Sequence, residues 1–95
     1  MLYELMEIIE ERKQNPQPDS YTSQLFSEGE DEILKKVGEE AMEVILAAKG
    51  QGIQRLVEEV ADLFYHTLVL LSSQDLSLAD VEAELSRRHS LKKAT

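Results

Sequence analysis

The chain has 95 residues, which suits a single domain spanning residues 1–95 and not two independent cores. Its 19 acidic residues against 10 basic ones give a net charge of −9. This balance excludes nucleic acid and anionic membranes as main partners, because both are bound by clusters of Lys and Arg. A polyanionic substrate would need a cation as a bridge. The lack of cysteine excludes disulfides, thiolate zinc sites and thiol catalysis.

No membrane segment is predicted. The longest strongly apolar run, residues 63–71, is far shorter than the roughly 20 residues of a spanning helix. The N-terminal residues lack a basic stretch and include Glu4 and Glu7, so we expect no signal peptide in them. We therefore expect a folded protein of the cytoplasm.

The N-terminal segment has the apolar spacing of a helix. Four apolar residues fall at i, i+3, i+4 and i+7, namely Leu2, Leu5, Met6 and Ile9. This pattern predicts a short amphipathic helix that ends near Arg12. Both prolines lie within residues 12–20, which indicates a loop. Residues 21–26 could add one helical turn capped by Ser20.

Two longer amphipathic segments follow. Ser27 and Glu30 have the spacing of a capping box, and we expect a helix from about residue 30 to 49 that ends before Gly50. A Gly-Gln-Gly reversal then leads to a helix from about residue 53 to 71. The second half of that helix is apolar almost all round, which predicts burial on several sides.

A last helix completes the expected fold. Ser77 and Asp80 form a second candidate capping box, opening a helix that runs to about His89. Four main antiparallel helices with short turns predict an all-α helical bundle. Three apolar residues lie away from the main stripes of the two long helices, namely Met42, Leu46 and Val69. This second apolar surface predicts that dimerisation completes the bundle.

Acidic residues concentrate in two blocks, one on each long helix: Glu39, Glu40 and Glu43, then Glu58, Glu59 and Asp62. Residues three apart share a helix face, so Glu40 pairs with Glu43 and Glu59 with Asp62. On the helical wheel the inner glutamates are Glu40 and Glu59, whereas Glu39 and Glu58 lie nearer solvent. An antiparallel hairpin would bring the two same-face pairs together.

Four converging carboxylates would repel one another, so protons or cations must neutralise them. Oxygen ligands favour a hard cation, Mg²⁺ or Mn²⁺, with Ca²⁺ also possible. The alternative is a solvated helix face, on which acids at this spacing are common. No lysine four residues further along the second helix offsets the repulsion, and this favours a metal site.

Several other residues have two possible roles. His66, one turn past Asp62, could contact substrate or orient Asp62, or it could be a packed residue. Lys35 and Lys36 could bind a substrate phosphate or form local salt bridges. The last pair of candidates for anion binding is Arg87 and Arg88, which could instead interact with the helix macrodipole.

Four segments carry a resemblance to a known family: Asp19-Ser20-Tyr21-Thr22-Ser23 with Leu25-Phe26, Ile33-Leu34-Lys35-Lys36-Val37-Gly38-Glu39-Glu40-Ala41-Met42-Glu43, Glu59-Val60-Ala61-Asp62-Leu63-Phe64-Tyr65-His66, and Glu84-Leu85-Ser86-Arg87-Arg88-His89. Over almost its whole length the chain resembles the phosphoribosyl-ATP pyrophosphohydrolases of histidine biosynthesis. These belong to the MazG-like all-α nucleotide pyrophosphohydrolase superfamily. Some relatives are fused to a cyclohydrolase whose zinc site uses cysteines, so this chain resembles the monofunctional members.

The resemblance implies hydrolysis of phosphoribosyl-ATP to phosphoribosyl-AMP and pyrophosphate. It also implies Mg²⁺ held by four acidic residues, namely Glu40, Glu43, Glu59 and Asp62, in agreement with the helical wheel. One carboxylate would act as the general base for water, and Glu39 and Glu43 are the candidates.

The resemblance further implies that the loop residues Arg12, Ser20, Tyr21 and Thr22 bind the phosphoribosyl part of the substrate. Their alternative is an ordinary surface loop. Two other functions stay open: a MazG-like enzyme that hydrolyses canonical or modified dNTPs, and a non-catalytic helical dimerisation module whose acids are only solvated.

Overall fold

The structure is a computed structural model that describes residues 1–94, with side chains up to residue 90, and all elements among these residues are helices. In chain order the helices are α1 (Leu2–Gln14), α2 (Tyr21–Glu28), α3 (Glu30–Gly50), α4 (Ile53–Ser73) and α5 (Leu78–Ala94). The predicted all-α class is confirmed.

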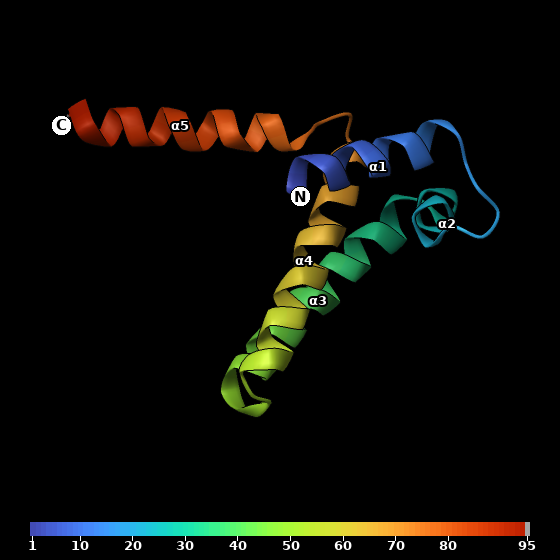
Figure 1. The fold of residues 1–95 in the computed structure, drawn as a ribbon, viewed down its shortest axis with the longest axis horizontal. Coiled ribbons are helices and arrows are strands. Elements are labelled where there is room, and N and C mark those ends of the chain that lie inside the picture. Colours follow the sequence, from blue (N-terminus) through green and yellow to red (C-terminus); the bar gives the residue numbers. More distant parts are fainter. Residues whose placement is uncertain (95) are drawn as a thin grey trace.

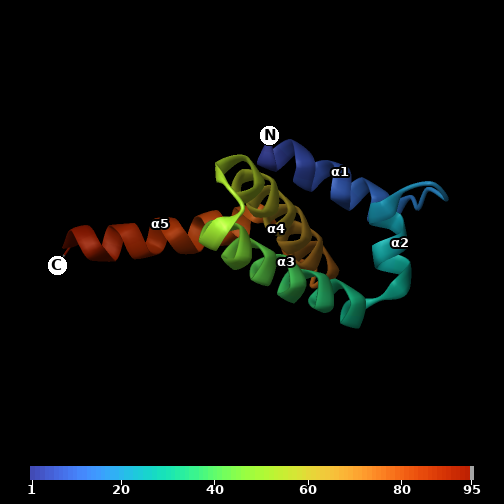
Figure 2. The same ribbon diagram turned by 90° about the horizontal axis from the view of Figure 1, so that it is seen from below.

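The long helices α3 and α4 form an antiparallel hairpin, and the other helices are arranged around one end of it (Figure 1). Helix α1 packs on the C-terminal half of α4, and α2 connects α1 to the start of α3 (Figure 2). Helix α5 projects away from this assembly (Figures 1 and 2). The last of the four predicted main helices is α5, and within one chain it does not lie beside the hairpin (Figures 1 and 2).

The buried core lies where α1, α2, the start of α3 and the end of α4 meet. Its fully or nearly fully buried apolar residues are Met6, Ile9, Leu25, Ile33, Leu68 and Val69. Burying such a side chain stabilises the fold by about 1.5–3 kcal/mol. The sequence predicted that Val69 lies on a second, outer surface, and this was wrong, because Val69 is fully buried. Helix α1 packs against the side of α4 that carries Val69, outside the main apolar stripe of α4.

The helix boundaries agree with the sequence to within a few residues except at the C-terminal end of α5, but the cap at the start of α3 differs. Ser20 caps α2 as predicted, because its Oγ accepts a hydrogen bond from the Ser23 amide at 3.2 Å. The capping box of Ser27 and Glu30 does not form, because Ser27 lies inside α2. Gly29 instead links α2 to α3 with a φ of 100°, a conformation that L side chains rarely adopt.

The capping contact predicted for α5 is present in part. The Ser77 amide donates to Asp80 Oδ2 at 2.8 Å, and the Ser77 hydroxyl contacts the same oxygen at 3.3 Å. The helix continues beyond the predicted end at His89, to Ala94.

A single chain leaves much apolar surface exposed. The side chains of Met42, Ile45, Leu46 and Phe64 are all about half exposed. The radius of gyration is 15.3 Å, whereas a compact chain of this length would have about 12 Å. Among the helices described, none is both long enough and apolar enough to cross a membrane.

Candidate metal centre

Three carboxylates meet at the seam between α3 and α4. Glu40 comes from α3, and Glu59 and Asp62 come from α4. One oxygen from each lies within 4.8 Å of the other two. Glu59 is buried, Glu40 is half-buried and Asp62 is exposed, so the cluster opens from the helix seam to solvent.

The order of burial follows the helical wheels. Glu39 and Glu58, predicted to lie nearer solvent, have side chains about half exposed. Glu43, the fourth predicted ligand, is half-buried one turn beyond Glu40 but is not part of the group of three. The structure thus brings together three of the four carboxylates that the sequence expected to converge.

The surroundings of Glu40 disfavour its charged form. Its pKa is raised above the ordinary value, first by partial burial, then by the negative charge of Asp62, and further by Glu59, while His66 acts in the opposite direction. The cluster therefore favours a proton or a cation over three free negative charges.

Arg55 is a residue of this site that the sequence reasoning missed. Its Nη2 lies 2.7 Å from Glu59 Oε1, and its Nη1 lies 3.3 Å from Glu58 Oε1. No lysine follows these acids at +4, as the sequence shows, but a basic side chain one turn before them does pair with them. The signal was available, because Arg55 precedes Glu59 by four residues, but only lysines following the acids were considered.

A wall of aromatic and hydroxyl groups from α2 and α4 borders the cluster. Nδ1 of the buried His66 lies 2.9 Å from the Asp62 carbonyl oxygen, and Nε2 lies 3.2 Å from the Tyr21 hydroxyl. A carbonyl can only accept, so in the neutral ring Nδ1 donates to it and Nε2 accepts from Tyr21. A hydrogen bond between the hydroxyls of Thr22 and Tyr65 is a second contact between α2 and α4.

These contacts fix α2 against the helix that carries two of the acids. The Tyr21 ring stacks on Tyr65 with centroids 6.3 Å apart. The pKa of Tyr21 is raised by partial burial, by Tyr65 and by Glu40, so the Tyr21 hydroxyl lies within the electrostatic field of the carboxylates. The pKa of Tyr65 is raised by burial.

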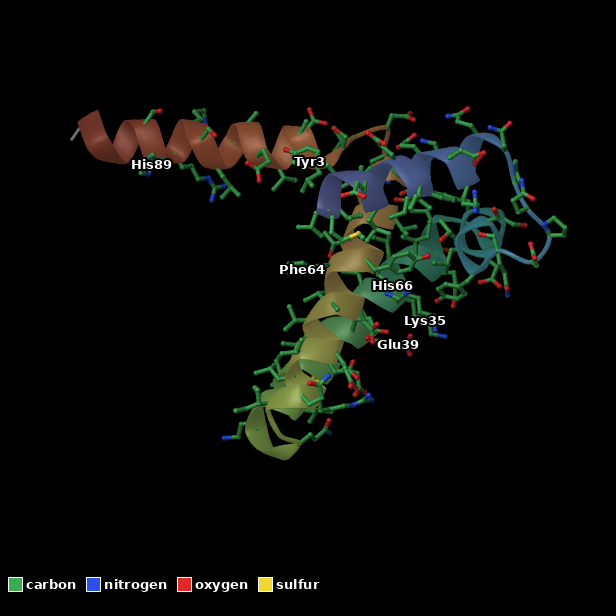
Figure 3. The ribbon with its side chains drawn as sticks, in the orientation of Figure 1. Tyr3, Lys35, Glu39, Phe64, His66 and His89 are labelled. Atoms are coloured by element: carbon green, nitrogen blue, oxygen red, sulfur yellow. The ribbon has the colours of Figure 1, made fainter. Side chains whose placement is uncertain are left out.

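Lys35 lies on the same flank of the hairpin as His66 (Figure 3), and Lys36 lies near Glu39. Lys35, Glu39 and His66 gather on one flank of α3 and α4, whereas Phe64 points to the opposite flank (Figure 3). Lys35 is exposed. Lys36 Nζ lies 3.9 Å from Glu39 Oε1, a long ion pair between partly exposed groups that stabilises little.

The predicted arginines pair with acidic residues outside the cluster. Arg12 pairs with the neighbouring Glu11 at 3.2 Å, and its backbone carbonyl accepts from the Ser23 hydroxyl at 3.1 Å. Arg87 and Arg88 bind Glu84 at 2.7 and 2.8 Å on α5, which projects away from the hairpin (Figure 1). Neither Arg87 nor Arg88 forms an ion pair with Glu40, Glu59 or Asp62 of its own chain.

The group of three fits a hard divalent cation. All of its ligand atoms are oxygens, which suits Mg²⁺, Mn²⁺ or Ca²⁺. Ligands of an octahedral Mg²⁺ at about 2.1 Å lie at most about 4.2 Å apart. Among three such ligands at least two pairs are adjacent, about 3.0 Å apart. The carboxylate oxygens, which lie within 4.8 Å of one another, would therefore have to move closer together around an ion.

An all-helical fold with an acidic cluster on a helical hairpin thus defines the class of this protein, an all-α protein whose cluster has the oxygen ligands of a divalent-cation site. The profile of the family described as "Phosphoribosyl-ATP pyrophosphohydrolase" matches residues 2–89. The chain therefore belongs to this family, and the resemblance noted in the sequence is confirmed.

Curated relatives carry a corresponding name. A protein of Bacillus thuringiensis (strain Al Hakam) and one of Bacillus cereus (strain 03BB102), each named phosphoribosyl-ATP pyrophosphatase, are 53% identical to the chain over 85 residues. A Bacillus anthracis protein of the same name is 52% identical. Each alignment covers 90% of this chain and 79% of the relative.

Proposed function

We propose that the chain hydrolyses phosphoribosyl-ATP to phosphoribosyl-AMP and pyrophosphate, the second step of histidine biosynthesis, with Mg²⁺ as cofactor and Mn²⁺ as a substitute. The observation that carries the proposal is the meeting of Glu40, Glu59 and Asp62 in a chain of this family. We further propose that it acts as a homodimer in the cytoplasm.

The carboxylates have separate roles in this proposal. Glu40, Glu59 and Asp62 hold the ion. When bound, the divalent ion supplies positive charge that offsets the polyphosphate and lowers the pKa of a bound water. Glu43 lies outside the group of three and half-buried on the same helix face as Glu40, so we assign it the acceptance of a proton from the attacking water. Glu39, the other candidate base, is more exposed and lies near Lys36.

The start of α2 supports a role in substrate binding. Tyr21 is 47% exposed and lies beside His66 at the acidic cluster, so its ring and hydroxyl can contact a bound nucleotide. Thr22 is buried against Tyr65 and holds this helix end in place. Lys35 and Lys36 add positive charge on the adjacent part of α3, where they attract phosphate groups.

A pyrophosphate-release assay of the purified chain tests the substrate. We expect rapid Mg²⁺-dependent release from phosphoribosyl-ATP and far slower release from dUTP or dCTP. The reverse ranking would assign the chain to the MazG-like dNTP hydrolases. No release from any of these nucleotides would favour a non-catalytic dimerisation module.

Two isosteric variants test the carboxylates. We expect Glu40→Gln and Asp62→Asn each to reduce kcat/KM roughly 100-fold or more, because each removes a charge that organises the transition state. Circular dichroism should report unchanged helicity. Glu58→Gln is the matched control, since Glu58 belongs to the same acidic block but lies outside the group of three. Normal turnover in Asp62→Asn would overturn the metal-site assignment.

A further inference from the structure

Arg55 and Glu59 form an ion pair whose two partners differ strongly in exposure. The Glu59 side chain is 4% exposed and the Arg55 side chain is 50% exposed, with Nη2 and Oε1 2.7 Å apart. Among the described residues, Arg55 is the only Lys or Arg that forms an ion pair with any of the three clustered carboxylates. Arg55 therefore supplies a positive charge at the cluster.

A buried carboxylate beside two other acids would be costly without such a partner. Glu59 lies in the second turn of α4, and its side chain is enclosed there. Arg55 lies one helical turn earlier, near the α3–α4 turn, and can move its guanidinium into water with little loss of packing.

We propose that Arg55 is an internal counter-ion of the carboxylate cluster, which a divalent cation displaces. The inference rests on the metal site of the proposed function. The guanidinium and the ion neutralise the same carboxylate and repel each other, so binding of the ion and formation of the Arg55–Glu59 pair are antagonistic. Arg55 thereby keeps the metal-free site folded and lowers its affinity for the ion.

Calorimetric titration of the full chain with Mn²⁺ alone, without substrate, tests this antagonism. We expect Arg55→Gln to bind Mn²⁺ about three- to tenfold more tightly than the wild type, because the competing ion pair is absent. Lys49→Gln is the matched control: it removes the same charge from the same end of the hairpin, and Lys49 has no ion pair with any described residue. It should change the affinity less than twofold.

Thermal unfolding gives a second readout. In the presence of EDTA, Arg55→Gln should unfold at a lower temperature than the wild type, and saturating Mn²⁺ should raise its Tm by more than it raises that of the wild type. Arg55→Lys retains the charge, and we expect its affinity and Tm to lie between those of the wild type and Arg55→Gln. It serves as the test variant if Arg55→Gln does not fold without metal.

The outcomes separate this inference from the proposed function. An affinity of Arg55→Gln that equals that of Lys49→Gln, or is weaker than that of the wild type, overturns the counter-ion role while leaving the metal site intact. If the wild type itself does not bind Mn²⁺ or Mg²⁺, the metal site of the proposed function fails, and the inference fails with it.

Discussion

Glu40 links the stability of the metal-free protein to pH. Its pKa is raised in the folded state, first by partial burial and then by the charges of Asp62 and Glu59. The folded state therefore binds the proton of this carboxyl more tightly than the unfolded state does. Protonation stabilises the fold, and this contribution is lost as the pH rises from the ordinary value of 4.5 through the folded-state pKa.

We therefore expect Glu40→Gln to lose less stability than the wild type when the pH is raised from 4.5 to 7 in the presence of EDTA. The glutamine side chain has no proton to lose in this pH range, so the part of the pH dependence that comes from Glu40 disappears. Thermal unfolding at a series of pH values measures the effect, and Glu58→Gln is the control. Equal pH dependence of stability in the wild type and Glu40→Gln would contradict the raised pKa of Glu40.

At the scale of helices, a polar clamp joins α1 to the end of α4. Lys13 Nζ donates to the Ser72 carbonyl at 2.6 Å and to Asp75 Oδ1 at 3.2 Å, and its side chain is 21% exposed. The fully buried Ser72 donates its hydroxyl to Glu10 Oε1 at 2.6 Å. A lysine at this place satisfies a terminal carbonyl and complements the negative end of the α4 dipole.

Replacing this lysine should loosen the contact between the two helices. We expect Lys13→Met to reduce the free energy of unfolding by about 1–2 kcal/mol, because a charge-assisted hydrogen bond at a helix end is lost. Urea unfolding of the metal-free protein measures the change. Lys49→Met, at the exposed end of α3, should have little effect, and an equal loss in both variants would argue against a specific clamp.

On the scale of the whole molecule, the single chain leaves an apolar face uncovered. An apolar groove between α4 and α5 includes Leu2, Phe64, Leu71, Val81 and Leu85. It lies on the flank of α4 opposite to His66 and Lys35, as the position of Phe64 indicates (Figure 3). A second copy could cover this groove without covering the acidic cluster, which supports the proposed homodimer.

We expect sedimentation equilibrium at micromolar concentration to give twice the chain mass of 10.8 kDa. Phe64→Glu should weaken the dimer at least tenfold, because it would place a charge in the apolar contact, whereas Phe64→Leu should retain the dimer. A stable wild-type monomer at this concentration would contradict the homodimer and would leave the exposed apolar surface unexplained.

The sequence by itself determined the helices and the direction in which each acid faces. Apolar spacing and glycines placed α3 and α4 within a few residues, and the helical wheel identified Glu40 and Glu59 as the inner acids. These features depend on the chain within a single helix, where 3.6 residues per turn fixes which side chains share a face. The motifs of the same segments were enough to indicate the family.

Only the tertiary structure decided which of these residues meet. The wheel of one helix does not give its axial register or rotation against the next, so the sequence could not separate Glu43 from the three clustered acids. It likewise placed Val69 on an outer surface, which α1 covers. The outward direction of α5 was also decided at this level, because the packing of helices on one another depends on the side chains of all of them together.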